Sequence, residues 1–183
     1  YQFSDPEAAL VPEGRPYALD IQSTYEVPAN LSHYDFGSAT GESFTGEPST
    51  KWFFAEAQGS STGATSDFLV WFNPGEVDVA LTIEFLFSGG GKREFPATAS
   101  SLRRGGLNLN EIAFLQDKVV SVLINAEAPI VAALTHFEPD PDDDGPETPK
   151  GYTSLGSAGE ASLYGVIPMS TLDTEADEEI VFY

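Results

Sequence analysis

The sequence has 183 residues, 41% of them hydrophobic and 12% aromatic, which is the composition of a folded chain able to bury one or two cores. Its 29 acidic and 8 basic residues give a formal net charge of -21 at pH 7, which argues against nucleic-acid binding and docking on anionic lipid, because the phosphates would be repelled. The sequence contains no cysteine, which excludes disulfides and thiolate metal sites, and no stretch approaches the ~20 apolar residues of a membrane helix, so no membrane insertion is expected.

The clearest predicted strands follow one another as a β-meander. Residues 68–72 are apolar and run into an Asn-Pro-Gly sequence at 73–75, where proline presets φ and glycine allows a positive φ, so a tight turn is expected. Residues 77–87 carry a large apolar side chain at every odd position, which is typical of a strand with one core face and one wet face. A glycine-rich loop then leads to a further strand at 92–95.

The later part of the chain also reads as short strands. Residues 107–110 alternate, and residues 119–124 and 130–137 form another pair separated by residues 125–129. Helical character is confined to residues 111–117, enough for a turn or two. About seven short strands with glycine and proline between them predict an all-β fold, an antiparallel β-sandwich of the immunoglobulin-like kind.

The two histidines lie at matching points of an internal repeat. Residues 28–35 and 131–138 align without a gap, with identical alanine, leucine and histidine, and residues 17–22 align with 120–125 at the same spacing. A feature that recurs with its surrounding strand indicates architecture rather than a single active site. We therefore expect both histidine-bearing segments to occupy the same place in duplicated two-layer scaffolds.

The repeat predicts three segments. Residues 1–44 would be the C-terminal half of a preceding repeat unit, and residues 45–165 one complete sandwich domain. Residues 166–183 would be the opening strand of a following unit or a strand donated to a neighbour. One complete unit is thus flanked by partial units, as in a slice through a tandem array or in a short protein that ends in partial units.

His33 and His136 each end an apolar face of a predicted strand. In residues 130–137, the alternate apolar residues share one face with His136, because successive side chains in a strand point to opposite sides. A histidine in this position is most often a residue at the edge of the core whose ring nitrogens bond to a loop backbone. We prefer this interpretation to catalysis or metal binding.

An acidic insertion at residues 138–150 interrupts the repeat. Asp140, Asp142 and Asp144, followed by glycine, fit the opening of a calcium loop, in which alternate oxygens face the ion. The match then fails, because Gly151 stands at the twelfth position in place of a bidentate glutamate. The three aspartates are candidate calcium ligands, and a solvated acidic loop is the alternative.

Catalytic signals are weak. Ser32, His33 and Asp35 supply the residue types of a triad, but neighbours on one strand point to opposite faces and cannot converge. The sequence has no G-x-S-x-G elbow, and glycines 89–91 lead into a strand rather than a helix, so they form no phosphate cradle. We expect no enzymatic activity and no cofactor other than calcium.

Four aromatic residues near the middle of the chain have two interpretations. Trp52, Phe53, Phe54 and Trp71 are suited either to a platform for sugar rings or to a core. Because large aromatic side chains dominate sandwich interiors, we expect core packing.

Four short motifs carry a resemblance to a known family. They are an aromatic-Phe-Phe-Ala-Glu start at 52–56, an Asn-Pro turn at 73–74, a Pro-Ile-Val-Ala strand at 129–132 and a Ser-Leu-Gly loop at 154–156. In this order they resemble a family of bacterial extracellular tandem-repeat β-sandwich domains. The resemblance implies a secreted, multi-copy part of a large surface polypeptide, and it carries over no catalytic residues.

These observations predict a structural repeat of an exported bacterial cell-surface or extracellular filament or matrix protein, whose partners are itself or neighbouring repeat units. The acidic residues 173–179 lead into a predicted terminal strand at residues 179–183, and this strand is suited to pair with an open sheet edge of another chain. The alternative is a carbohydrate-binding module, or a calcium-dependent adhesion module, that recognises glycans. In both cases an extracellular or cell-surface location is expected.

Overall fold

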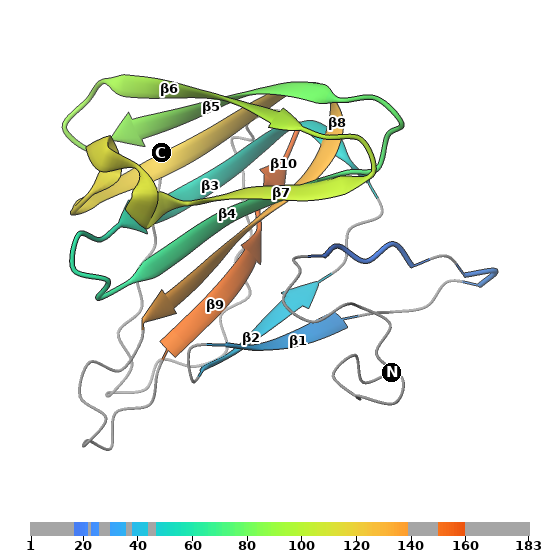
Figure 1. Ribbon diagram of the computed structural model, residues 1–183, viewed down its shortest axis with the longest axis horizontal. Helices are drawn as coiled ribbons and strands as arrows, with labels where there is room; N and C mark the ends of the chain where they lie inside the picture. Colours follow the sequence, from blue (N-terminus) through green and yellow to red (C-terminus); the bar gives the residue numbers. More distant parts are fainter. Residues whose placement is uncertain are drawn as a thin grey trace.

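The structure is a computed structural model that describes residues 17–21, 23–25, 30–35, 38–43, 47–138 and 150–159. The described chain is almost entirely antiparallel strand (Figure 1), so the predicted all-β class is confirmed. Its helical turns are two 3₁₀ helices, η1 (Leu109–Glu111) and η2 (Ala113–Leu115), close to the predicted position. In this described part, no helix is long and apolar enough to cross a membrane.

Two sheets form the layers of an open sandwich. Their strands are β3 (Ser49–Gly59), β4 (Ser66–Asn73), β5 (Val79–Phe87), β6 (Lys92–Ala99), β7 (Arg103–Asn108), β8 (Lys118–Glu138), β9 (Lys150–Leu155) and β10 (Ser157–Ala158). The first sheet has the order β6-β5-β8-β3-β10, and the second has the order β7-β4-β8-β9. Strand β8 therefore belongs to both sheets and joins them.

Strand β8 has 21 residues and passes from one sheet to the other. Residues 118–126 pair with β3 and β5, whereas residues 130–138 pair mainly with β4 and β9. Residues 127–129 pair with no strand in between, and Pro129 fits this corner because it needs no ladder N–H there. The predicted break at 125–129 was therefore wrong, because the chain stays extended while it changes sheets.

One hydrophobic core lies between the sheets, and alternate residues of each central strand supply it. The even-numbered residues of β8 face the core in both halves, and Ile124 and Ile130 are fully buried. The odd-numbered residues of β5 do the same from Val79 to Phe85, which confirms the predicted alternation. Val77, which was included in that strand, precedes it and is 69% exposed.

The aromatic residues interpreted as core residues are buried. Trp52, Phe54 and Trp71 belong to the hydrophobic core, which confirms the expected packing and removes these three from any sugar-binding platform. The indole N–H of Trp52 donates a hydrogen bond to the carbonyl oxygen of Ile130 at 2.9 Å. This bond fixes β3 to β8 just after the corner.

The reversal between β4 and β5 falls where the Asn-Pro-Gly sequence predicted it, but its mechanism differs. Gly75 has no positive φ. Instead, the buried side chain of Asn73 accepts a hydrogen bond from the Gly75 N–H and donates to the carbonyl oxygens of Val77 and Ala99, each at 2.8 Å. The asparagine thus ties the turn to the end of β6.

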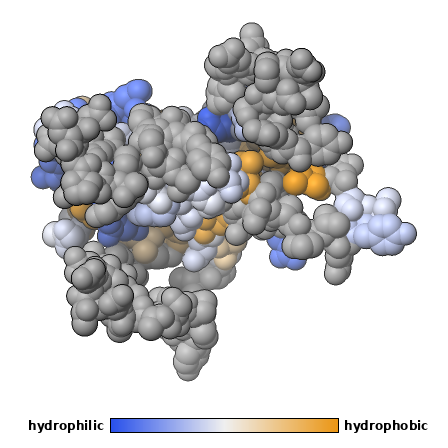
Figure 2. Space-filling model, turned by 90° about the horizontal axis from the view of Figure 1, so that it is seen from below, coloured by the Kyte–Doolittle hydropathy of each residue, from blue (hydrophilic) through white to orange (hydrophobic). Residues whose placement is uncertain are grey.

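Strands β1 (Asn30–Asp35) and β2 (Ser38–Ser43) form a separate two-stranded sheet, and β2 lies beside β9. His33 pairs with Thr40 in this hairpin, whereas His136 lies on a strand that is paired on both sides. The expectation that both histidines occupy the same place in duplicated scaffolds was therefore wrong. Seen from below (Figure 2), the described apolar surface gathers near the middle of the face, with hydrophilic residues around it.

Candidate functional site

Asp67, His136 and Tyr152 form a row across three neighbouring strands, called here the polar row. The register pairs Asp67 of β4 with His136 of β8, and His136 with Tyr152 of β9. Directly opposed side chains in antiparallel strands lie on the same face. Asp67 is 0% exposed, His136 is 6% exposed and Tyr152 is 44% exposed, so the polar row runs from the core to the surface.

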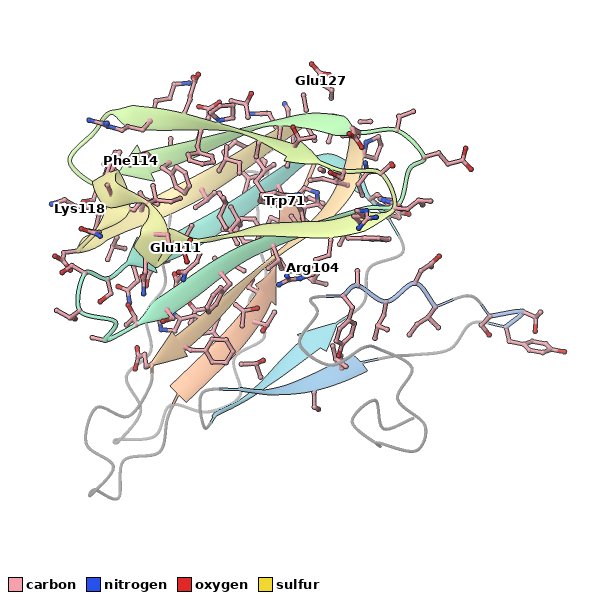
Figure 3. All side chains as sticks on the ribbon, viewed as in Figure 1. Trp71, Arg104, Glu111, Phe114, Lys118 and Glu127 are labelled. Carbon is pink, nitrogen blue, oxygen red and sulfur yellow. The ribbon has the colours of Figure 1, made fainter. Side chains whose placement is uncertain are left out.

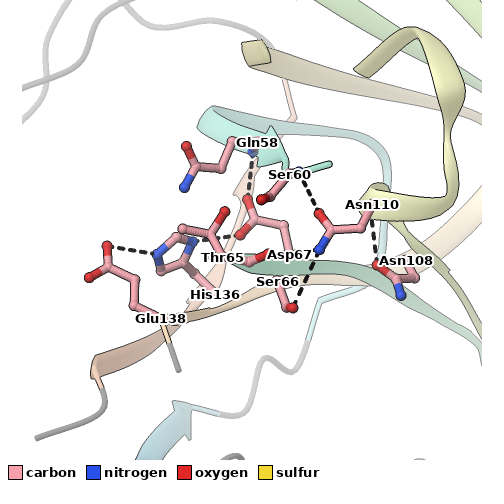
Figure 4. A network of polar contacts seen from close by, with 9 residues as sticks. All are labelled: Gln58, Ser60, Thr65, Ser66, Asp67, Asn108, Asn110, His136 and Glu138. Atoms are coloured by element: carbon pink, nitrogen blue, oxygen red, sulfur yellow. Dashed lines mark hydrogen bonds and ion pairs between the residues drawn. The ribbon is translucent and has the colours of Figure 1, made fainter. Parts of the chain in front are cut away.

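Both carboxylate oxygens of Asp67 are engaged (Figure 4). Oδ2 accepts a hydrogen bond from the backbone N–H of Gln58 at 2.6 Å, and Oδ1 lies 2.5 Å from Nδ1 of His136. An isolated buried carboxylate costs several kcal/mol, which these two bonds offset. Asp67 therefore connects β4 to β3 on one side and to β8 on the other.

His136 lies between two carboxylates and against an aromatic ring. Its Nε2 is 3.3 Å from Oε1 of Glu138, and its ring stacks on that of Tyr152 with the centroids 4.8 Å apart. Burial lowers the pKa of His136, but the hydrogen bonds and charges of Asp67 and Glu138 together outweigh it and the pKa is raised. The imidazolium form can donate a hydrogen bond from each of its two ring nitrogens.

Tyr152 is held in its neutral form. Burial, together with the negative charges of Asp67, Glu56 and Glu138, raises the pKa of Tyr152 to about 12. Its phenol therefore stays protonated at neutral pH and does not act as a base there.

The loop between β3 and β4 is fixed beside the polar row. Oδ1 of Asn110 accepts the Ser60 N–H at 2.7 Å, and Nδ2 of Asn110 donates to the Thr65 carbonyl at 2.7 Å. Asp117 accepts hydrogen bonds from the Ser61 N–H and hydroxyl, and these bonds lower the pKa of Asp117. The polar residues around η1 therefore organise the loop that leads into the buried aspartate (Figure 4).

The polar row resembles part of a catalytic triad, but its geometry is that of a structural link. A catalytic His–Asp pair presents the second ring nitrogen to a nucleophile or substrate. In His136, Nδ1 faces Asp67 and Nε2 faces Glu138. The arrangement holds three strands together and leaves the second nitrogen facing another carboxylate.

Sequence reasoning found one member of the polar row and missed the others. The expected position of His136 at the core edge is confirmed, but the expected loop-backbone partners were wrong, because its ring nitrogens face carboxylates. The sequence did contain a signal for Asp67. It lies two residues before Leu69 and four before Trp71, so in a strand its side chain is on the same face as these core residues. Extending the predicted strand at 68–72 by one residue would have placed this acid on the core face.

The predicted calcium ligands Asp140, Asp142 and Asp144 lie outside the described residues, so the calcium site stays a prediction. No group of three His, Cys, Asp or Glu side chains in the described ranges could hold a metal ion. The side chain of His33 is also outside the described part of the chain.

A shallow groove of about 410 Å³ lies where the edge strands β6 and β7 meet η1 and η2. It is lined by Phe95, Gly106, Leu107, Asn108, Glu111, Ile112, Ala113 and Phe114. The Phe114 ring packs edge-on against Phe85 at 5.7 Å, and the guanidinium of Arg93 lies 5.3 Å from its centroid. Figure 3 shows Phe114 and Glu111 at the 3₁₀ end of the molecule and Arg104 further along β7.

Comparisons with known proteins bear on the fold alone. No protein-family model and no curated protein matches the sequence. The fold is similar to the crystal structure of Thermotoga maritima 1070, with a TM-score of 0.52 and 22% identity over 63% of this chain and 98% of that chain. A second similar structure is the Anabaena sensory rhodopsin transducer, with a TM-score of 0.42 and 19% identity over 46% of this chain and 91% of that chain. The first likeness supports the sandwich architecture, and neither indicates an activity.

Proposed function

We propose that this chain is a structural β-sandwich repeat unit of an exported bacterial cell-surface or extracellular protein, and that it associates with neighbouring units or copies of itself by strand addition. The observation that carries this proposal is the open side of the sandwich. Within the described residues, β6 pairs only with β5, and β7 pairs only with β4. The unpaired N–H and C=O groups of such edges form a template for another strand.

The chemistry of the polar row supports a structural role. Asp67 and His136 are buried, bonded to each other and placed in the register of the second sheet. We therefore expect substitution of Asp67 or His136 to lower the free energy of unfolding, and we assign neither residue a step in a reaction.

The extracellular assignment is supported by the motifs shared with the secreted repeat family and by the acidic composition. A net charge of -21 makes copies of the chain repel one another at low ionic strength, and salt screens this repulsion. The alternative of carbohydrate binding is less well supported, because Trp52 and Trp71 are buried and cannot form a platform for sugar rings.

The proposal is tested by the mass of the full chain in solution. Sedimentation velocity at increasing protein concentration, at low and at high salt, should show reversible growth from monomer to linear oligomers, and negative-stain images should show end-to-end particles. Salt should strengthen the association, because it screens the repulsion between acidic copies. A chain that stays monomeric at every concentration and salt level would contradict the proposal.

A further inference from the structure

His136 is held at both ring nitrogens, two residues before the end of β8 (Figure 4). Its Nδ1 lies 2.5 Å from Oδ1 of Asp67, and its Nε2 lies 3.3 Å from Oε1 of Glu138. His136 and Glu138 share a face of the strand, because side chains two residues apart point to the same side. The side chain of Asp67 is 1% exposed and that of Glu138 is 46% exposed. The imidazole therefore connects a buried carboxylate to one that reaches solvent.

The two contacts of the ring differ in how they depend on its proton. A neutral imidazole carries one N–H and one lone pair, whereas the imidazolium carries two N–H groups. Because the carboxylate of Asp67 is fully buried and needs a donor, the remaining proton of a neutral His136 stays on Nδ1. Nε2 then presents its lone pair to a carboxylate oxygen of Glu138, and neither atom has a proton to share. Glu138 is therefore held by the protonated ring alone.

The other ionisable groups around the ring leave this dependence with His136. Tyr152 of β9 stacks on the ring, and its pKa is raised to about 12, so the phenol stays neutral in the range where histidine titrates. Glu56 of β3 is a further acid whose negative charge reaches Tyr152. Strand β2 lies beside β9, and the side chains described on it, Thr40 and Gly41, do not ionise. Burial lowers the pKa of His136, but its two carboxylate partners outweigh burial and the pKa is raised.

The end of β8 is also where the pairing with β9 begins. Glu138 pairs with Lys150, the first residue of β9, and His136 pairs with Tyr152. Strand β9 has six residues and, within the described part of the chain, makes its backbone pairs with β8 alone. A short strand at the edge of a sheet opens from its end at low cost in free energy. A contact that fixes Glu138 therefore fixes the first pairs of β9.

We propose that His136 is a proton-controlled latch on β9. The imidazolium donates from Nδ1 to Asp67 and from Nε2 to Glu138, and it keeps the end of β8 and the start of β9 together. When the Nε2 proton passes to solvent, Glu138 turns to water and the pairs between residues 136–138 and 150–152 loosen, while the bond to Asp67 remains. The latch is independent of the proposed assembly of copies, and it makes the attachment of β9 respond to pH.

Amide hydrogen exchange of the full chain tests the latch, followed from about pH 5 to about pH 9 and corrected for the intrinsic rate at each pH. In the wild-type chain, protection of the amides of residues 151–155 should fall by about threefold as His136 loses its proton, which is the size expected for an ion pair with one half-exposed partner. Protection of β6, an edge strand of the other sheet, should stay unchanged, because its local opening breaks no contact of His136.

A matched pair of variants assigns the change to Glu138. Glu138→Gln should abolish the pH step in β9, because its amide can accept from the protonated ring and donate to the neutral one. Glu127→Gln, at an exposed acid of the same strand, should keep the step. Protection of β9 that is constant with pH in the wild-type chain, a step that survives Glu138→Gln, or an equal step in β6 would each overturn the latch.

Discussion

The two halves of β8 hold their sheets with different chemistry. In residues 118–126, one face is buried and purely apolar, with Val120, Val122 and Ile124, and the other face is partly exposed. In the second half, the run of residues 132–137 is buried on both faces and includes His136. A buried polar group needs a partner, and the neighbouring strand supplies Asp67. A strand covered on both sides therefore accepts a polar residue where the register brings it a charged partner.

The largest expected effect on stability comes from removing the buried carboxylate that pairs with the second half of β8. Asp67→Ala should lower the free energy of unfolding by about 4 kcal/mol, because His136 and the Gln58 N–H lose their buried partner. Urea denaturation monitored by tryptophan fluorescence measures the change.

A matched control and a rescue sharpen the result. Glu127→Ala removes an exposed acid and should change stability by less than about 0.5 kcal/mol. The double variant Asp67→Leu with His136→Leu should be more stable than either single variant, because it leaves no unpaired charge. Additive losses in the double variant would show that the two residues are not coupled.

In the first, apolar half of β8, truncating a core side chain should leave a cavity that destabilises the fold. Ile124→Ala should lower the free energy of unfolding by about 3 kcal/mol, since Ile124 is fully buried and its neighbours relax only in part. Val119→Ala, at a residue 51% exposed on the same half-strand, is the control and should have little effect. Equal losses in the same denaturation assay would contradict the assignment of the core face.

Loosening the loop between β3 and β4, which leads into Asp67, should have a smaller effect on the free energy of unfolding. Asn110→Ala removes the hydrogen bonds to Ser60 and Thr65 and should cost about 1 kcal/mol. Hydrogen exchange of the amides of residues 60–65 should become faster, while exchange in residues 118–126 should stay unchanged. Faster exchange in both segments would mean that the loop and the first half of β8 open together.

The smallest effect is the dependence of stability on pH. Because the pKa of His136 is raised in the folded chain, its contribution is fully present below its ordinary pKa of about 6.5 and is lost as pH rises through the folded value. The wild-type chain should therefore lose stability on this rise in pH, and His136→Gln should lack this part of the profile. A second loss is expected from pH 10 upward, because the pKa of Tyr152 is raised to about 12. Unfolding midpoints measured from pH 5 to above pH 10 test both signs.

Local patterns in the sequence predicted the fold class and the alternation of β5, because these depend on neighbouring residues. The change of sheet at Pro129 was not predicted, because proline and alanine after a strand look the same whether the chain forms a loop or a corner. Of the polar row, His136 alone was predicted, because the register that brings Asp67 and Tyr152 to His136 is set by pairing between distant segments. The similarity around the two histidines was misleading for the same reason, since it contains no information about partner strands.

The most direct test of the central claim is nitrogen NMR of the His136 imidazole across pH, assigned with a His33→Gln variant. If Asp67 and His136 are a structural link, both ring nitrogens should remain protonated to a pH above 6.5, and Asp67→Asn should lower the pKa of His136. A His136 that titrates at or below 6.5, unaffected by Asp67→Asn, would contradict the account.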